Sequence, residues 1–244
     1  FPKTRLIHVD IDPQELGRNY APDLGIIADV KVFTRQLLQA VASHAELQAA
    51  RFAPWLADVQ SWQAQWEAFV RPHFSDSTSP LRPEFVVGTL QKVLPDDVIL
   101  SLDSGVHHNW FMQFWQAKRP QSMLNSWGYS SMGFGVCGIM GAQLAAPDRP
   151  CVAVVGDGGF MMTGNEMIAA VQRRLPILFI LANNGSYASI RIHQERAYPQ
   201  RHPGTDLFNP DFSAIAQGFG MSVERIERED QIDAALQRGL QTDG

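Results

Sequence analysis

The chain has 244 residues, with 20 Lys or Arg against 25 Asp or Glu, so its formal net charge is −5 when His is neutral. This mild acidity argues against nucleic-acid-binding and anionic-membrane-binding proteins, which carry a basic surface. No apolar run reaches the roughly 18 to 20 residues that span a bilayer. Two cysteines are too few for a disulfide framework. We therefore expect a globular enzyme in the cytoplasm.

The first part of the chain predicts alternating strands and helices. We expect strands at residues 6–11 and 25–28 and helices at residues 14–19 and 32–43, because the apolar residues follow strand and helix spacing in turn. The sequence enters a strand pattern at once, without a signal peptide and without an initial Met. We expect it to be a piece of a longer polypeptide.

A tryptophan-rich helix and a linker follow. Apolar residues recur at helical spacing across residues 52–70, and three of them are tryptophans. Residues 71–83 hold three prolines beside a run of Ser, Asp and Thr, which is typical of a linker. The predicted organisation is an α/β segment, a helix with linker, and a second α/β domain: residues 1–45, 46–82 and 83–244.

The predicted fold class is α/β, with open parallel sheets flanked by helices. Continuous apolar runs at residues 152–155 and 177–181 suit parallel strands that are buried on both faces. We expect further strands at 98–102 and 221–226, and helices at 83–94 and 132–144.

Two strand ends carry the residues with the clearest chemistry. Gly156-Asp157-Gly158-Gly159 follows one predicted strand at a helix start, where bare backbone amides favour a bound phosphate. Asp157 would repel that phosphate unless a divalent cation bridged the two. Asn184 follows the next strand, and the carboxyl ends of parallel strands meet at one edge. Asp157 and Asn184 are therefore candidate oxygen ligands for Mg²⁺. An ordinary turn Asp and a strand-capping Asn pair are the alternative.

This pair of motifs resembles the diphosphate-binding signature of thiamine-diphosphate-dependent enzymes, of the acetolactate synthase-like and benzoylformate decarboxylase-like kinds. The resemblance implies that Asp157, Asn184 and the backbone carbonyl of Ser186 bind Mg²⁺. It also implies a set of residues that contact thiamine diphosphate: Ser130, Met132, Gly156, Asp157, Gly158, Gly159, Asn184, Ser186 and Tyr187.

Two upstream segments extend the resemblance. Ser130-Ser131-Met132-Gly133-Phe134-Gly135 is similar to a family segment in which a bulky apolar residue bends the cofactor rings into a V, a role that falls on Met132. The carbonyl of Ser130 would accept from the aminopyrimidine, although Ser replaces the usual Gly. A plain core role for Met132 is the alternative. The stretch from Asp103 to Trp115 is similar to the opening of the same domain in acetolactate synthases.

Two further residues are candidates for catalysis or substrate contact. His107 follows a strand end that would face the cofactor. Ile190 stands where pyruvate decarboxylases have a Glu, so it is either a substrate-pocket residue or a helix-packing residue. The segment from Tyr198 to Phe208, which contains Pro199, Pro203 and Gly204, predicts a mobile loop over the site.

The N-terminal segment is similar to the end of the family's central domain. In acetolactate synthases that domain holds FAD, and in many relatives it holds ADP or nothing, so FAD is one of three alternatives. Asp10 and Asp29 either contact such a nucleotide or simply end strands. The activating Glu of the family comes from a preceding pyrimidine-binding domain, normally on another subunit. The resemblance therefore implies a homodimer or homotetramer, and it implies that this chain alone is inactive.

The expected reaction is thiamine-diphosphate- and Mg²⁺-dependent cleavage or formation of a C–C bond on a small-molecule 2-oxo acid. An acetolactate synthase-like carboligase is the leading hypothesis, and a benzoylformate-type decarboxylase is the second. A catalytically silent cofactor-binding half is the third. A nicotinamide-binding Rossmann protein is disfavoured, because no G-x-G-x-x-G follows a strand.

Overall fold

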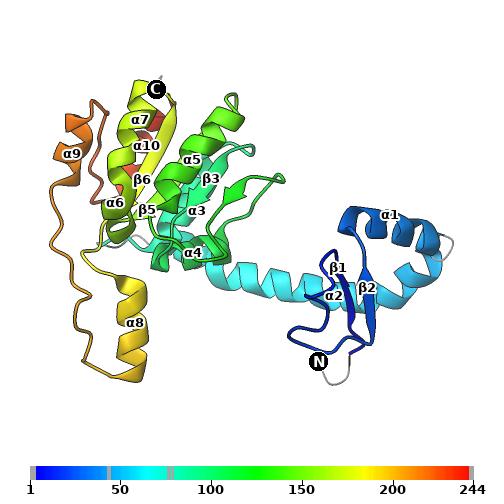
Figure 1. Cartoon of the computed structure of the whole chain (residues 1–244). Coiled ribbons are helices and arrows are strands. Elements are labelled where there is room, and N and C mark those ends of the chain that lie inside the picture. The colour runs from blue at the N-terminus through cyan, green and yellow to red at the C-terminus, as the bar shows by residue number, and fades with distance from the viewer. Residues whose placement is uncertain (1–3, 43–44, 76–77, 79, 242–244) are drawn as a thin grey trace. The chain divides into compact units, whose positions relative to one another are not determined.

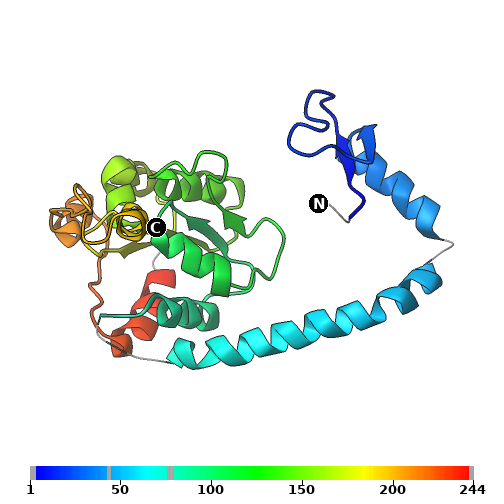
Figure 2. The ribbon, with the colours of Figure 1, turned by 90° about the horizontal axis from the view of Figure 1, so that it is seen from below.

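The computed structural model describes residues 4–42, 45–75, 78 and 80–241. Backbone contacts divide the chain into two compact units, residues 1–68 and 69–244. Figures 1 and 2 show the first unit in blue and cyan and the second from cyan to red. None of the helices within the described ranges is long and apolar enough to cross a membrane.

The first unit contains two parallel strands, β1 (Ile7–Asp10) and β2 (Leu24–Ile27), with Ile7 opposite Leu24. Helix α1 (Val30–Val41) follows, and the Asp29 carboxylate caps it by accepting from the amides of Lys31 and Val32, each at 3.0 Å. The predicted strands and this helix are confirmed. Asp29 therefore serves as a helix cap in this structure.

The predicted helix at residues 14–19 is wrong, because this segment forms turns. The Asp10 carboxylate accepts from the amide of Asp12, and the Asp12 carboxylate accepts from the amide of Gln14, both at 2.9 Å. Aspartates that bond to the backbone two residues further on compete with helix formation. These local bonds explain why turns replace the helix.

Helix α2 (Ala45–Val70) is longer than predicted and contains Pro54. The rings of Trp55 and Trp62 meet edge to face, with centroids 5.4 Å apart. A short 3₁₀ helix, η2 (Arg71–Ser75), follows within the predicted linker.

The second unit is built on a parallel sheet with the strand order β4-β3-β5-β6. Its strands are β4 (Met123–Leu124), β3 (Ile99–Leu102), β5 (Cys151–Gly156) and β6 (Ile177–Ala182). Leu102 lies opposite Val154, and Gly156 lies opposite Ala182. The α/β class with parallel sheets flanked by helices is confirmed.

The strand predicted at residues 221–226 is wrong, since this segment has no strand pairing in the structure. Its side chains hold it instead. The carboxylate of Glu224 accepts two hydrogen bonds from the Arg238 guanidinium, both at 2.6 Å, and Ile226 packs against the core. The segment is therefore attached through side chains and not through backbone strand pairing.

Helices cover both faces of this sheet (Figure 1). α3 (Pro83–Val93), α4 (Val106–Phe114) and α10 (Ile232–Leu240) pack on one face, where Leu90, Phe111 and Leu236 contact Leu100 and Val152. The other face is covered by α5 (Phe134–Ala145), α6 (Asp157–Thr163), α7 (Met167–Gln172) and α9 (Phe212–Gly218). The remaining elements are α8 (Ala188–Ala197), η3 (Gly164–Glu166) and η4 (Glu229–Gln231).

Alternate residues of β5 enter the two cores. Val152 and Val154 belong to the first cluster, whereas Cys151, Ala153 and Val155 belong to the second. Burial on both faces explains the continuous apolar sequence of this strand. It also leaves the carboxyl end of the strand as the place where polar residues emerge.

Candidate functional site

The carboxyl ends of β3, β5 and β6 lie side by side. The strand register places Leu102 beside Val154 and Gly156 beside Ala182. The next residues along the chain, Asp103, Asp157 and Asn183, therefore emerge at a single edge of the sheet. This is the edge at which open α/β sheets bind ligands.

Asp157 is a buried carboxylate at the start of α6, and its side chain is held by neutral donors. It is 3% exposed. Oδ1 accepts from the amide of Gly158 at 2.9 Å, and Oδ2 accepts from the amide of Gly185 at 2.7 Å and from Asn209 Nδ2 at 2.7 Å. Among the described residues, no Lys, Arg or His forms an ion pair with it.

The surroundings of Asp157 fit a divalent cation. Burial of an ionised carboxylate is costly unless a charge compensates it. The neutral amides around Asp157 orient its oxygens without cancelling its charge, and a carboxylate offers about four lone-pair positions. Three are used here, so one position is left for a cation.

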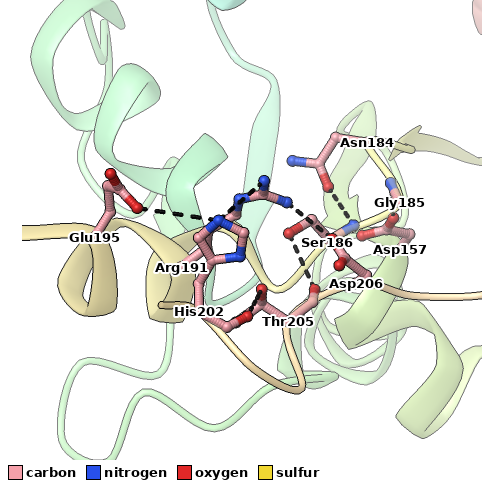
Figure 3. A network of polar contacts seen from close by, with 9 residues as sticks. All are labelled: Asp157, Asn184, Gly185, Ser186, Arg191, Glu195, His202, Thr205 and Asp206. Carbon is pink, nitrogen blue, oxygen red and sulfur yellow. Dashed lines mark hydrogen bonds and ion pairs between the residues drawn. The ribbon is translucent and has the colours of Figure 1, made fainter. Parts of the chain in front are cut away.

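Asn184 and Ser186 lie directly beside this carboxylate (Figure 3). Asn184 Oδ1 accepts from the amide of Ser186 at 3.0 Å, and Ser186 Oγ donates to the carbonyl of Thr205 at 3.0 Å. Asn184 is exposed, so its amide oxygen keeps a lone pair toward solvent. A carboxylate, an amide oxygen and a backbone carbonyl together form a hard oxygen set of the kind that Mg²⁺ takes with water and phosphate oxygens.

This oxygen set does not depend on a cluster of charged or imidazole side chains. Across residues 4–42, 45–75, 78 and 80–241, no group of three or more His, Cys, Asp or Glu is placed to hold a metal ion. The set described above has a single carboxylate. Its remaining oxygens come from an amide and from the backbone.

The glycines after β5 make room for neighbouring groups at the start of α6. A Cβ atom added at Gly159 would lie 1.8 Å from Asp103 Oδ2. One added at Gly158 would lie 2.4 Å from the Tyr187 ring and 3.3 Å from the Met132 methyl. One added at Gly156 would lie 3.2 Å from the ring of His107. The structure therefore gathers Tyr187, Met132 and His107 around the predicted diphosphate loop.

His107 presents an unpaired nitrogen within this group. Its Nε2 atom is buried and has no hydrogen-bond partner among the described residues. Burial lowers the pKa of His107, and the nearby Asp103 carboxylate opposes this shift only in part. The ring is therefore neutral near pH 7, and its free nitrogen is available to a ligand.

Ser130 and Met132 lie in the loop that precedes α5. Ser130 has φ +49°, in the left-handed region, and its carbonyl accepts from Ser104 Oγ at 2.6 Å. Met132 is half-buried and is part of neither core cluster of the described chain. This placement agrees better with a role in the site than with a plain core role.

Ile190 lies on α8, is 49% exposed and faces the same cleft. The cleft has a volume of about 2190 Å³ and is formed entirely by the second unit. It is lined by every residue that the sequence predicted for the site: His107, Ser130, Met132, Gly156, Asp157, Gly158, Gly159, Asn184, Ser186, Tyr187 and Ile190.

The segment from Tyr198 to Phe208 is hydrogen-bonded to the site loop. The carbonyl of Thr205 accepts from the amide of Tyr187 at 2.8 Å, and Arg191 pairs with Asp206 at 2.8 Å. Figure 3 shows these side chains directly beside Ser186. These contacts attach the segment to the start of α8.

Sequence reasoning missed two residues that support the site. Asp103 is fully buried, and its carboxylate accepts from the amides of Gly133 at 3.0 Å and Gly135 at 3.2 Å, which caps α5. Asn209 reaches Asp157 from a loop 52 positions away. Asp103 had a local signal, a polar residue at a strand end, whereas Asn209 had none.

The chain is similar to known proteins over most of its length. A family model described as "Thiamine pyrophosphate enzyme, C-terminal TPP binding domain" matches residues 103–244. The chain is 32% identical over 236 residues to a Mycobacterium bovis protein named acetolactate synthase. The aligned region covers 95% of this chain and 38% of that protein.

Two further relatives come from other organisms. Acetolactate synthase 1, chloroplastic, of Zea mays is 27% identical over 250 residues, which is 99% of this chain and 39% of that protein. A protein of Methanocaldococcus jannaschii named probable acetolactate synthase large subunit is 29% identical over 249 residues, which is 98% of this chain and 40% of that protein. The chain therefore spans about two-fifths of the length of these curated relatives.

Proposed function

The chain belongs to the thiamine pyrophosphate enzymes, through their C-terminal TPP-binding domain, and from this we propose that it is part of a thiamine-diphosphate- and Mg²⁺-dependent enzyme that acts on 2-oxo acids. The leading activity is acetolactate synthase-like carboligation. The observation that carries the proposal is the buried Asp157 carboxylate, which has only neutral donors and faces Asn184 and Ser186 at a glycine-lined helix start.

The metal end of the site has clear roles for its residues. Asp157, the amide oxygen of Asn184 and the carbonyl of Ser186 would hold Mg²⁺, which would offset the repulsion between Asp157 and a diphosphate. The Gly158 amide donates to Asp157, whereas the Gly159 amide belongs to the same first turn of α6, where a phosphate is stabilised.

The other end of the cleft would orient the organic part of the cofactor. Thiamine diphosphate, when bound, supplies the electron sink for breaking and forming the C–C bond. The half-buried Met132 side chain would support the rings, and the Ser130 carbonyl would accept a hydrogen bond from the aminopyrimidine. Neutral His107 would offer its free Nε2, and Ile190 would contact an apolar part of the substrate.

The proposal also includes partners outside this chain. Because the chain spans about two-fifths of its relatives' length, we propose that a pyrimidine-binding domain of a neighbouring subunit supplies the activating Glu in a homodimer or homotetramer. We propose that residues 1–45 are the end of a central domain and that FAD is one candidate nucleotide for it. A cytoplasmic location is supported by the two cysteines, both of which are free thiols.

Product analysis of the full-length protein with 2-oxo acids tests the function. A carboligation product that requires both thiamine diphosphate and Mg²⁺ would support the leading activity. Aldehyde and CO₂ without carboligation would instead favour a benzoylformate-type decarboxylase. Binding of thiamine diphosphate without formation of any product would indicate that the protein is a cofactor-binding half without catalytic activity. An absorbance spectrum of the same preparation tests for flavin.

A further inference from the structure

A single amide side chain connects the two loops that form the proposed metal site. Asn209 lies between α8 and α9, and its Nδ2 donates to Asp157 Oδ2 at 2.7 Å and to Asn183 Oδ1 at 2.8 Å. Asp157 follows β5, whereas Asn183 follows β6. No other described side chain donates to both of these residues.

The two acceptors fix the orientation of the Asn209 amide. Both partners are oxygens that accept at these positions, and only the NH₂ end of an amide can donate. With the NH₂ group directed at Asp157 and Asn183, both of its hydrogens are used. Asn209 therefore acts as a double donor, and the one remaining lone pair of the Asp157 carboxylate, on Oδ1, stays free.

The backbone on both sides holds Asn209 in this position. On one side, the amide of Leu207 donates to the carbonyl of Gly185 at 2.8 Å. On the other side, Pro210 restricts the backbone, and the Asp211 carboxylate caps α9 by accepting from the amides of Ser213 and Ala214. The backbone that carries Asn209 is thus held in place on both sides.

We propose that Asn209 is a positioning residue for the divalent cation. Its amide holds the Asp157 carboxylate in the rotamer that presents the free lone pair to the metal, and it keeps the loop after β6 at the matching distance. This inference rests on the proposed function, because it concerns the same cation. Outer partners of metal ligands typically change metal affinity by about 10- to 100-fold when they are removed.

The test compares metal affinity in the full-length protein. Asn209→Ala removes both hydrogen bonds, and Asn209→Leu removes them while nearly preserving the volume. The dissociation constant of Mg²⁺ is measured by calorimetry at saturating thiamine diphosphate, and the melting temperature is measured without metal. We expect both variants to bind Mg²⁺ about 10- to 100-fold more weakly, with a small change in melting temperature.

Asp206→Asn is the matched control. It breaks the ion pair between Asp206 and Arg191 in the same loop, 2.8 Å long and exposed, without touching Asp157. Its Mg²⁺ affinity should stay close to that of the wild type. An equal loss in this control would show that loop attachment in general, rather than the Asn209 amide, sets the affinity, and would overturn the inference.

The remaining outcomes are also decisive. Unchanged Mg²⁺ affinity in both Asn209 variants would overturn the inference while leaving the proposed function intact. Failure of both variants to fold would make Asn209 a general folding contact instead of a positioning residue. A wild-type protein without Mg²⁺-dependent thiamine diphosphate binding would overturn the proposed function and this inference together.

Discussion

The hydroxyl of Ser104 donates to the carbonyl oxygen of Ser130 over 2.6 Å and so joins the residues after β3 to the loop before α5. Ser130 itself has φ +49°, a left-handed conformation that costs a non-glycine residue roughly 1–2 kcal/mol. The contact fixes the direction of the carbonyl that we propose faces the aminopyrimidine. It also identifies a strained position in the loop before α5.

Ser130→Gly should raise the free energy of unfolding by up to about 1 kcal/mol. Relief of the left-handed strain exceeds the roughly 0.5–1 kcal/mol that the greater backbone freedom of glycine costs. Urea unfolding measures the change. Ser130→Ala, which keeps the strain, is the control and should not be more stable than the wild type. A glycine variant less stable than the alanine variant would contradict this account of Ser130.

Gly159→Ala should destabilise the protein by on the order of 2 to 4 kcal/mol. The new Cβ atom would lie 1.8 Å from Asp103 Oδ2, so the carboxylate that caps α5 would have to move. Gly141→Ala is the matched control within α5, because a Cβ atom there meets nothing within 4 Å. The control should gain about 0.5–1 kcal/mol of helix propensity. Similar unfolding free energies for the two variants would refute the role of Asp103.

Met132→Ala should lower turnover much more than cofactor affinity. The metal end of the site remains intact in this variant, whereas misplaced rings can cost ~10²-fold in rate. A plain core role would instead cost on the order of 2 to 5 kcal/mol of stability through a cavity, with normal turnover in the folded molecules. Melting temperature, cofactor affinity and turnover are measured on one preparation. Normal turnover per loaded site would remove Met132 from the site.

His107 should make stability depend on pH. Burial lowers its pKa in the folded protein, whereas the unfolded chain titrates near about 6.5. The unfolded state therefore binds more protons as the pH falls below that value, and the folded state loses stability. Urea unfolding at pH 7.5 and 5.5 should show this loss in the wild type, and the loss should be smaller in His107→Gln. Equal pH dependence in both proteins would argue against a buried neutral ring.

Much of the fold was predictable where burial alone determines the pattern. The apolar runs at 152–155 and 177–181 predicted β5 and β6 to within two residues at each end, because strands between two helical layers need apolar residues throughout. The strand predicted at 221–226 was wrong: the segment joins no sheet, and Glu224 bonds to Arg238 of α10 through its side chain. The helix predicted at 14–19 was wrong because local Asp side chains bond to the backbone.

The chemistry of the site was more predictable than its support. Asp157 and Asn184 follow strand ends, so a local motif pointed to them, and the structure brings both into a single cleft. A helix start at Asp157 was predicted, but the extent of α6 was not, because its sequence contains two glycines and its formation depends on packing. Asn209 could not be predicted either, since its contact with Asp157 exists only after the loop before α9 has folded back onto β5.

The central claim is that Asp157 binds a cation that in turn binds a diphosphate. The most direct measurement is calorimetric titration of the full-length protein with thiamine diphosphate, with Mg²⁺ and with EDTA, for the wild type and for Asp157→Ala. We predict that the wild type binds with Mg²⁺ and loses binding in EDTA, and that Asp157→Ala shows no metal-dependent binding at all. Equal affinity in the wild type and the variant, or full binding in EDTA, would contradict the claim.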